Sequence, residues 1–159
     1  MYAGRIYTVA WDAATAVTAQ IDVFEVAPAD DKPVMIHELK MWQTTELGDA
    51  AEEIIGIQLL RGYTTSGSGG GTSTAARRMP GDAAASFAHE CRNTTLATTT
   101  TPDVVEADGW NVRVPYIWTP APEDRPWCSE AQSRIVVRLM AAPADSITMY
   151  ATLKVEELG

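Results

Sequence analysis

The feature that most constrains this chain is a strict alternation of apolar and polar side chains, one residue at a time. It is clearest near the C-terminus, where apolar residues occupy every second position: Ile147, Met149, Ala151, Leu153 and Val155. Successive side chains of a β-strand point to opposite faces, whereas a helix would scatter these groups around its axis. The pattern therefore predicts a strand with one buried face.

The same period of two recurs along the chain, in residues 5–11, 15–26, 34–43, 104–107, 110–118 and 134–140. Within residues 15–26 and 34–43 the alternation slips by one position, which indicates a β-bulge or a bend from one sheet to another. Residues 53–63 are almost continuously apolar. A buried helix is compatible with that run, but its β-branched residues and Gly56 favour a central strand.

Several connections between these strands carry turn signals. The Asp108-Gly109 pair predicts a turn, and Pro115, which has no N–H to donate, places its strand at an edge or breaks it. Residues 141–146 predict a link that is either a long hairpin loop or a crossing between two sheets.

Two segments fall outside the alternating pattern. Residues 64–74 contain only Ser, Thr and Gly and predict a flexible surface loop. Residues 81–88 are compatible with a short helix that has Asp82 near its N-cap. Neither segment interrupts the prediction of a sheet-rich body.

The composition agrees with that prediction, because Val, Ile and Thr contribute 39 of the 159 residues and β-branched side chains fit a pleated surface. About eight short strands predict an all-β, antiparallel two-sheet sandwich of the jelly-roll type. We expect a single domain over residues 1–159, with residues 1–14 as an N-terminal arm or an edge strand. An immunoglobulin-like sandwich is the rival, although its Cys…Trp…Cys spacing is not apparent.

The charge of the chain argues against some partners. Acidic residues number 21 and basic residues 12, for a formal net charge of −9. A phosphate backbone is repelled by such a surface, so nucleic acid is not an expected partner. No stretch approaches the roughly 20 apolar residues needed to cross a bilayer, and the N-terminus lacks the pattern of a secretory signal. We therefore expect no membrane association, and folding in the cytoplasm of the cell that makes the protein.

The sequence contains no recognisable catalytic constellation. His37 and His89 stand alone, and no Ser lies in a nucleophile elbow. Cys91 and Cys128 are not part of a metal-binding pair, and free, partly buried thiols are favoured over a disulfide. We expect no enzymatic activity, no catalytic residues, no metal and no cofactor.

Three pairs of neighbouring carboxylates, at residues 30–31, 52–53 and 156–157, are interpreted as solvated surface charge. Adjacent acids in a strand face opposite ways, so they do not form a glycosidase pair by themselves. At Asp30 and Asp31 the alternative is a contribution to a Ca²⁺ site.

Tryptophan is frequent, with five in this chain. Trp118 and Trp127 stand at either end of a proline-rich segment that includes Pro120 and Pro122. Tryptophan is enriched at interface hot spots because it buries a large area at little entropic cost. We predict these four residues as a subunit interface; the alternatives are caps at the ends of the sandwich or a platform for stacking on sugars.

Three stretches together resemble a known family: residues 54–63 with the Ser/Gly loop that follows, residues 109–113 running on to Pro126-Trp127, and residues 135–139 with the link and last strand. This layout, over roughly residues 34–157, resembles the jelly-roll capsid decoration (cement) proteins of tailed bacteriophages.

The resemblance implies a homotrimer on the outer surface of the phage head, where it clamps neighbouring major capsid proteins. It implies a structural virion protein made in the host cytoplasm, and it carries no catalytic residues. The alternative function is a carbohydrate-binding jelly-roll module or a virion receptor-binding protein. A cupin-type enzyme would need clustered histidine ligands, which two isolated histidines do not supply.

Overall fold

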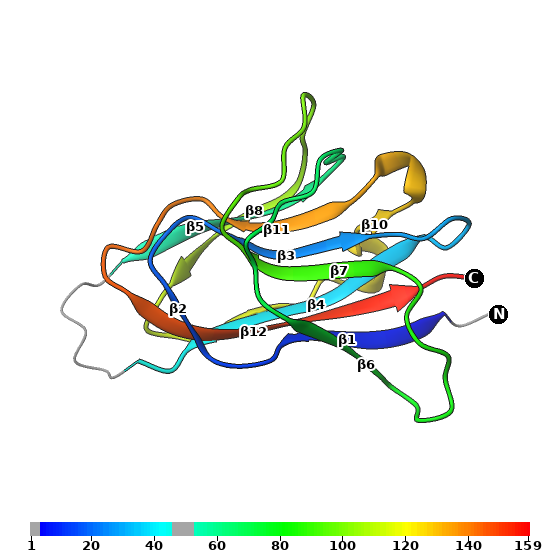
Figure 1. The fold of residues 1–159 in the computed structure, drawn as a ribbon, viewed down its shortest axis with the longest axis horizontal. Helices are drawn as coiled ribbons and strands as arrows, with labels where there is room; N and C mark the ends of the chain where they lie inside the picture. The colour runs from blue at the N-terminus through cyan, green and yellow to red at the C-terminus, as the bar shows by residue number, and fades with distance from the viewer. Residues whose placement is uncertain (1–3, 46–52) are drawn as a thin grey trace.

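The computed structural model describes residues 4–45 and 53–159, which form two antiparallel sheets packed as a sandwich (Figure 1). The seven-stranded sheet comprises β1 (Arg5–Trp11), β2 (Thr15–Val17), β4 (Val34–Gln43), β6 (Ser73–Arg77), β9 (Tyr116–Trp118), β10 (Trp127–Cys128) and β12 (Ile147–Glu157). The five-stranded sheet comprises β3 (Asp22–Ala27), β5 (Ile54–Arg61), β7 (Ala88–Asn93), β8 (Asp103–Asn111) and β11 (Ile135–Leu139). The predicted all-β two-sheet sandwich is confirmed.

The order of the strands is that of a jelly roll. In one sheet β1, β12 and β4 are neighbours, with β9 and β10 on the far side of β4; in the other the order is β7-β3-β11-β5-β8. Along the chain β3, β4 and β5 alternate between the sheets, and so do β8, β9, β11 and β12. An immunoglobulin sandwich instead pairs consecutive strands such as A and B within one sheet. The jelly-roll prediction is confirmed, and the rival is wrong.

The space between the sheets is filled by the apolar side chains that the alternation singles out. In β12 every second residue from Ile147 to Val155 is buried, as predicted, and the opposite positions are half-buried. Trp110, Phe24 and Tyr7 are the largest aromatic side chains that are almost fully buried. Burial of this apolar surface is the main force that holds the two sheets together.

Both phase slips of the sequence correspond to real irregularities. In β4, Ile36 pairs with Val155 and Glu38 with Lys154, which leaves His37 as the extra residue of a β-bulge. Residues 15–26 divide between the sheets, because β2 pairs with β12 whereas β3 pairs with β11 and β7. The link at residues 141–146 joins β11 to β12 and is therefore a crossing between sheets.

The turn predicted at Asp108-Gly109 is wrong. Strand β8 runs straight through this pair, and Gly109 faces Gly56 of β5. Pairing along the whole length of β5 outweighs the local turn preference of the dipeptide. The chain turns only after Asn111, where the indole N–H of Trp110 donates to the carbonyl of Val114 (2.8 Å) and β8 ends before Pro115.

The helix considered for residues 81–88 is also wrong. Residues 80–81 make a turn and the next residues are irregular until β7 begins. Tertiary partners replace the helical hydrogen bonds, because the Ser86 N–H donates to Glu157 and the Tyr7 hydroxyl donates to the carbonyl of Ala83. The described residues form twelve strands, more than the sequence predicts, and β6 begins inside the predicted 64–74 loop.

The segment expected as an arm or edge strand contributes β1, which pairs with β12 on one side and β6 on the other. Residues 5–11 therefore form an interior strand of the seven-stranded sheet. Residues 1–3 lie outside the described part of the chain.

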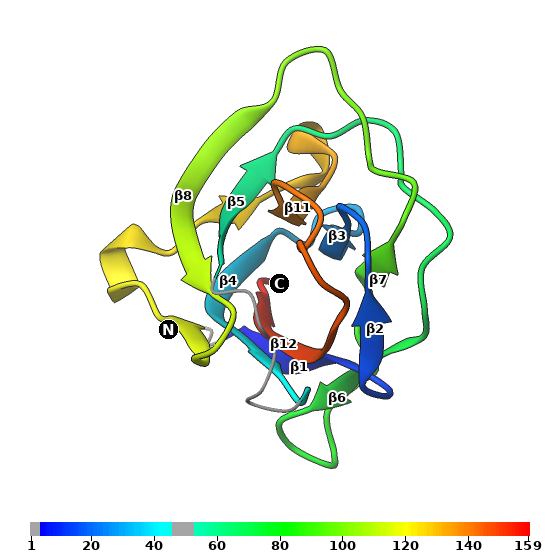
Figure 2. The same cartoon turned by 90° about the vertical axis from the view of Figure 1, so that its left-hand side faces the viewer.

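The outer face of the five-stranded sheet is covered by the chain's own loops. Residues 62–71 and 94–101 pair through the bridges Thr65–Thr98 and Ser68–Thr95 and lie outside β3 and β11 (Figure 2). Beneath them Asp22 and Glu25, both buried, form ion pairs with Arg138 and Arg134. The part of this face over β3 and β11 is therefore covered by the protein itself, whereas Ile54 on β5 and Val104 on β8 stay exposed.

Candidate functional site

The outer face of the seven-stranded sheet carries accessible apolar side chains. A row of neighbouring residues crosses four strands: Trp127, Met35, Glu156 and Ile6. Trp127 is 47% exposed, and Ile117 on β9 is 61% exposed. Exposed aromatic and aliphatic residues among charged neighbours are typical of a surface that binds another macromolecule.

A loop projects from the edge of this face (Figure 2). Trp118 pairs with Leu39 and Trp127 pairs with Met35, so residues 119–126 stand opposite only residues 36–38 of β4. The surplus chain bows away from the sheet beside the β-bulge and is held at its end by the Ile36 N–H, which donates to the carbonyl of Pro126 (2.9 Å). We call residues 119–126 the proline loop; its tip is the short helix η1 (Pro122–Asp124).

Between the proline loop and the sheet lies a groove of about 400 Å³. The wall on the loop side comes from Thr119 and Arg125, and the floor from β1, β4 and β12. Arg78, the residue after β6, closes the far end. His37, the extra residue of the β-bulge, and its neighbour Glu38 line the groove from β4.

The carboxylates at the floor of the groove are already engaged. Glu38 binds Lys154 (2.8 Å) and Lys40 (3.1 Å). Burial alone would raise the pKa of the Glu38 carboxyl, but the hydrogen bonds and charges of the two lysines outweigh it and lower that pKa. Glu156 lies 2.5 Å from the Nε2 of His37 and accepts a hydrogen bond from the Gly4 N–H (2.9 Å).

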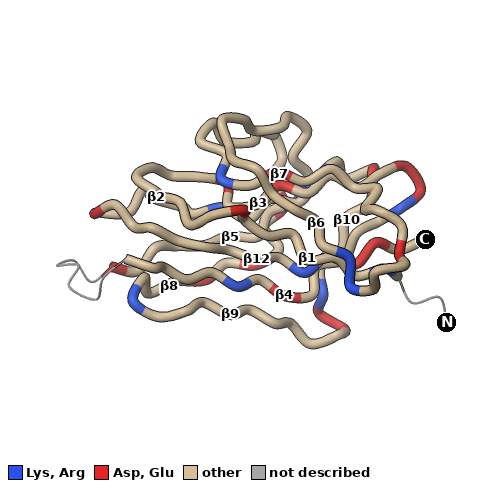
Figure 3. Tube along the Cα trace, turned by 60° about the horizontal axis from the view of Figure 1, so that its bottom comes forward, with Lys and Arg blue, Asp and Glu red and all other residues tan. Residues whose placement is uncertain are grey.

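The arginines of the groove are not paired in this way. Within residues 4–45 and 53–159, neither Arg78 nor Arg125 has a carboxylate within ion-pair distance. The Nε of Arg125 is shielded from solvent and has no hydrogen-bond acceptor. The groove thus concentrates unneutralised positive charge on a chain whose net charge is −9, and Figure 3 shows acidic and basic positions side by side on this part of the molecule.

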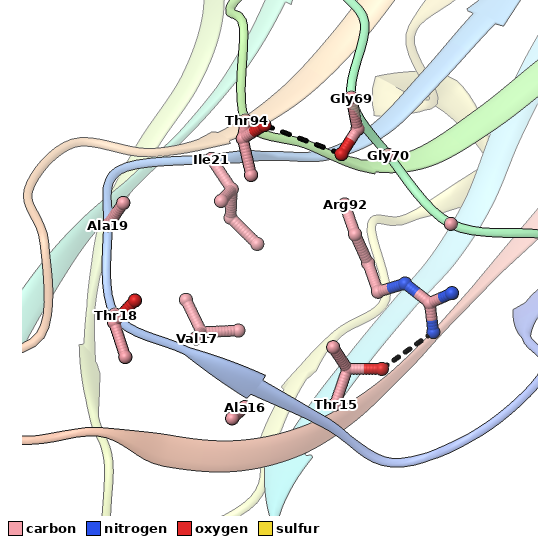
Figure 4. Close-up of a pocket in the computed structure, with 11 residues that line it drawn as sticks. Thr15, Ala16, Val17, Thr18, Ala19, Ile21, Gly69, Gly70, Arg92 and Thr94 are labelled. Atoms are coloured by element: carbon pink, nitrogen blue, oxygen red, sulfur yellow. Dashed lines mark hydrogen bonds between the residues drawn. The ribbon is translucent and has the colours of Figure 1, made fainter.

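A second hollow, of about 280 Å³, lies where the chain crosses between the sheets at residues 15–21 (Figure 4). Its charged side chain is Arg92, whose guanidinium donates to Thr15 Oγ1 (2.7 Å) and forms an ion pair with Asp12 (2.9 Å). The same guanidinium lies over the ring of Trp11 and against Gly71. Arg92 is therefore engaged within the protein and links β7 to the crossing segment.

The four residues predicted as a subunit interface all lie in or beside the proline loop. Trp118 points inward and packs partly against the core, and Pro120 is half-buried. Pro122 is exposed at the start of η1, and Trp127 is the more accessible of the two tryptophans. The structure thus brings the four residues to one side of the groove, and their role as an interface stays a prediction.

Sequence reasoning did not find the cationic side of the groove. Arg78, Arg125 and Lys154 are far apart in the sequence, and only the fold brings them together. The phase slip in β4 predicts the bulge at His37, which lines the groove, but it does not report the cations.

The other candidate groups are structural. His89 is half-buried with its Nδ1 2.7 Å from Ser73 Oγ, and burial lowers its pKa. Cys91 and Cys128 are buried free thiols, as the sequence favoured. Burial raises the pKa of Cys128 to about 11, so this thiol stays protonated near neutral pH. No cluster of three or more metal-ligating side chains occurs in the described ranges.

The surface interpretation of the carboxylate pair at residues 156–157 is wrong for Glu157. Its side chain is buried and accepts hydrogen bonds from the Ser86 N–H and hydroxyl, with Lys32 at 3.8 Å. Asp30 and Asp31 are exposed in a turn, as expected. Glu52 lies outside the described residues.

Comparison with known proteins adds no family to this picture. No family model, no curated protein and no solved structure matches the chain. In the part of the chain that the structure describes, no helix is long and apolar enough to span a membrane. The function is therefore argued from the fold and the groove.

Proposed function

We propose that the chain is a structural virion protein, a capsid decoration (cement) protein. It binds the outer surface of a tailed-phage head and stabilises contacts between major capsid proteins. It is not an enzyme, and its partners are the major capsid protein and further copies of itself, in a homotrimer. It is made in the host cytoplasm and remains on the head surface of the virion.

One observation supports this proposal above the others: the two outer faces of the jelly roll are unequal. The loops of the chain cover the five-stranded sheet over β3 and β11, whereas the seven-stranded sheet presents Trp127, Ile117 and the cationic groove. A rigid sandwich that presents aromatic, aliphatic and cationic side chains together on one face suits a protein that binds a large surface. The three stretches that resemble cement proteins form β5, the end of β8 with the proline loop, and β11.

The direct test uses heads of a phage from which this gene has been deleted. We expect the purified protein to sediment with such heads, to saturate at a fixed ratio to the major capsid protein, and to raise the temperature at which the heads release DNA. Trp127→Ala is expected to weaken head binding by about tenfold or more, since buried interface tryptophans are typical hot spots.

The matched control for Trp127→Ala is Val104→Ala, because Val104 is similarly exposed (51%) but lies on the five-stranded sheet. This control is expected to bind heads as the unchanged protein does. Failure of the unchanged protein to sediment with heads at any concentration would exclude the proposed function.

A second candidate function is carbohydrate binding, and a pair of aromatic rings favours it. Trp42 and Tyr150 are neighbours on β4 and β12, with ring centroids 6.0 Å apart and planes inclined by 33°. Aromatic side chains on an open sheet face are suited to stacking on sugar rings. Binding on a glycan array, with quenching of tryptophan fluorescence that is lost in Trp42→Ala, would support this candidate over the first.

A further inference from the structure

The proline loop and the groove beside it carry opposite charges that are not neutralised within one copy. Glu123 and Asp124 at the tip of the loop are exposed and have no ion-pair partner in the described residues. Arg78 and Arg125 at the groove are likewise unpaired there, and the Nε of Arg125 is shielded from water. A shielded guanidinium N–H without an acceptor is costly unless a ligand supplies one.

The tip does not reach the groove of its own chain. The Asp124 N–H donates to the carbonyl of Ala121 (2.9 Å), which closes η1 and fixes the two acids on the projecting end of the loop. Pro120, Pro122 and Pro126 restrict the backbone on both sides of that end. The acids are therefore held away from the sheet, as Figure 2 shows for the loop as a whole.

We propose that the tip of the proline loop of one copy occupies the groove of a second copy. The carboxylates of Glu123 and Asp124 then bind the guanidinium groups of Arg78 and Arg125, and one carboxylate oxygen accepts the shielded Arg125 N–H. Charge-assisted bonds between arginine and carboxylate are among the stronger polar contacts in proteins.

The shape of the two surfaces favours this occupant. The loop is held in its projecting form before association, so little conformational entropy is lost on docking. Trp127 follows the loop directly, is 47% exposed, and adds accessible apolar area on the same face of the sheet. Tip and groove are different surfaces of one chain, so the contact runs head to tail, the kind of contact that forms a ring when the rotation between copies closes.

This inference deepens the proposed function, and it rests on that function only for the expected number of three copies. The contact itself rests on the unpaired charges. Since these charges lie at the protein surface, the association is also expected to weaken as the salt concentration rises.

The test is a charge exchange read by light scattering after size-exclusion chromatography. Reversal of the tip in Glu123→Lys/Asp124→Lys, or of the groove in Arg78→Glu/Arg125→Glu, is expected to raise the dissociation constant of the oligomer on the order of 10- to 100-fold. The variant with all four substitutions restores opposite charges and is expected to restore the oligomer. Circular dichroism and thermal unfolding confirm that each variant is folded.

Two matched controls reverse charges outside the contact. Arg77 precedes Arg78 but does not line the groove, and Glu130 is exposed on η2 (Glu130–Gln132), away from the proline loop. Arg77→Glu and Glu130→Lys are expected to leave the oligomer unchanged. A monomeric unchanged protein, persistence of the oligomer in both reversed variants, or dissociation in the variant with all four substitutions would each overturn the inference.

Head binding separates this inference from the proposed function. If the reversed variants lose the oligomer and the unchanged protein does not bind heads, the loop-in-groove contact stands and the decoration function is excluded. If the unchanged protein decorates heads but both reversed variants still form the oligomer, the decoration function stands and the loop-in-groove contact is excluded.

Discussion

The two outer faces of this sandwich differ in whether their arginines are paired with a carboxylate. On the five-stranded sheet Asp22 and Glu25 are buried beneath loops and paired with Arg138 and Arg134. On the seven-stranded sheet Arg78 lines an open groove and has no partner in the described residues. Both faces belong to one jelly roll, so the difference between them comes from the placement of charges and loops and not from the fold itself.

On the five-stranded sheet, the buried charges hold the covering loops in place. Asp22 is held by Arg138 at 2.5 and 3.0 Å and accepts the Ala97 N–H (2.7 Å), while Arg138 donates to the carbonyl of Ala97 (2.7 Å). One buried ion pair thus fixes the covering loop through both backbone polar groups of a single residue, Ala97. Burial would lower the pKa of Arg138, but its hydrogen bonds and charge interaction with Asp22 raise it.

The largest effect is expected from breaking this ion pair. Asp22→Ala leaves Arg138 buried without its counter-charge, and such losses cost about 3–5 kcal/mol. Urea unfolding followed by tryptophan fluorescence measures the change. The double variant Asp22→Leu/Arg138→Met removes both charges and is expected to recover most of the loss. Equal stability of Asp22→Ala and the unchanged protein would mean that the loops do not depend on the pair.

A smaller effect is expected at Gly67, where the two covering loops lie close together. Gly67 is buried, and a Cβ added there would lie 2.5 Å from the backbone carbonyl of Thr95. Gly67→Ala is therefore expected to lower the free energy of unfolding by about 1–3 kcal/mol. Gly81→Ala is the matched control, because nothing lies within 4 Å of its added Cβ. A similar loss in both variants would show that chain flexibility, and not crowding, is responsible.

The sheet-rich fold could be predicted from the sequence because alternation is a local signal with a strong energetic consequence. The buried face of β12 and the bulge in β4 were both visible in that way. Features that depend on partners distant in the sequence could not be predicted in this way. For example, β8 continues through Gly109 because β5 pairs with it. The burial of Asp22 was missed for the same reason, although an acid inside an apolar strand, with Arg134 and Arg138 alternating on another, was a usable signal.

The candidate site was predictable only in part. The tryptophans and prolines of residues 118–127 are close in sequence, so their shared position was expected. The cations of the groove come from β12, the proline loop and the residue after β6. Only the strand order of the sheet places them together, and no spacing in the sequence reports it.

An effect of intermediate size is expected from pH, through His89 on β7, whose Nδ1 lies 2.7 Å from Ser73 Oγ on β6. Burial lowers the pKa of this histidine below its ordinary value of 6.5, so the folded state resists protonation more than the unfolded chain does. The free energy of unfolding is therefore expected to fall as the pH drops below about 6.5. In His89→Gln this part of the pH dependence should disappear when urea midpoints at pH 5.5 and 7.5 are compared; an unchanged slope would assign it to other groups.

The smallest effect is expected from the groove, and it sharpens the comparison between the faces most directly. Arg125→Ala removes a guanidinium without an ion-pair partner in the described part of the chain, so we expect the free energy of unfolding to change by less than about 0.5 kcal/mol. Arg134→Ala, the same substitution on the five-stranded sheet, removes the ion-pair partner of the buried Glu25. It is expected to lower the free energy of unfolding by about 3 kcal/mol or more. Urea unfolding of dilute protein, where copies are dissociated, gives both values under one condition. If Arg125→Ala lowers the free energy of unfolding as much as Arg134→Ala does, Arg125 stabilises the fold of a single copy. That result would contradict its assignment as a contact to a second copy.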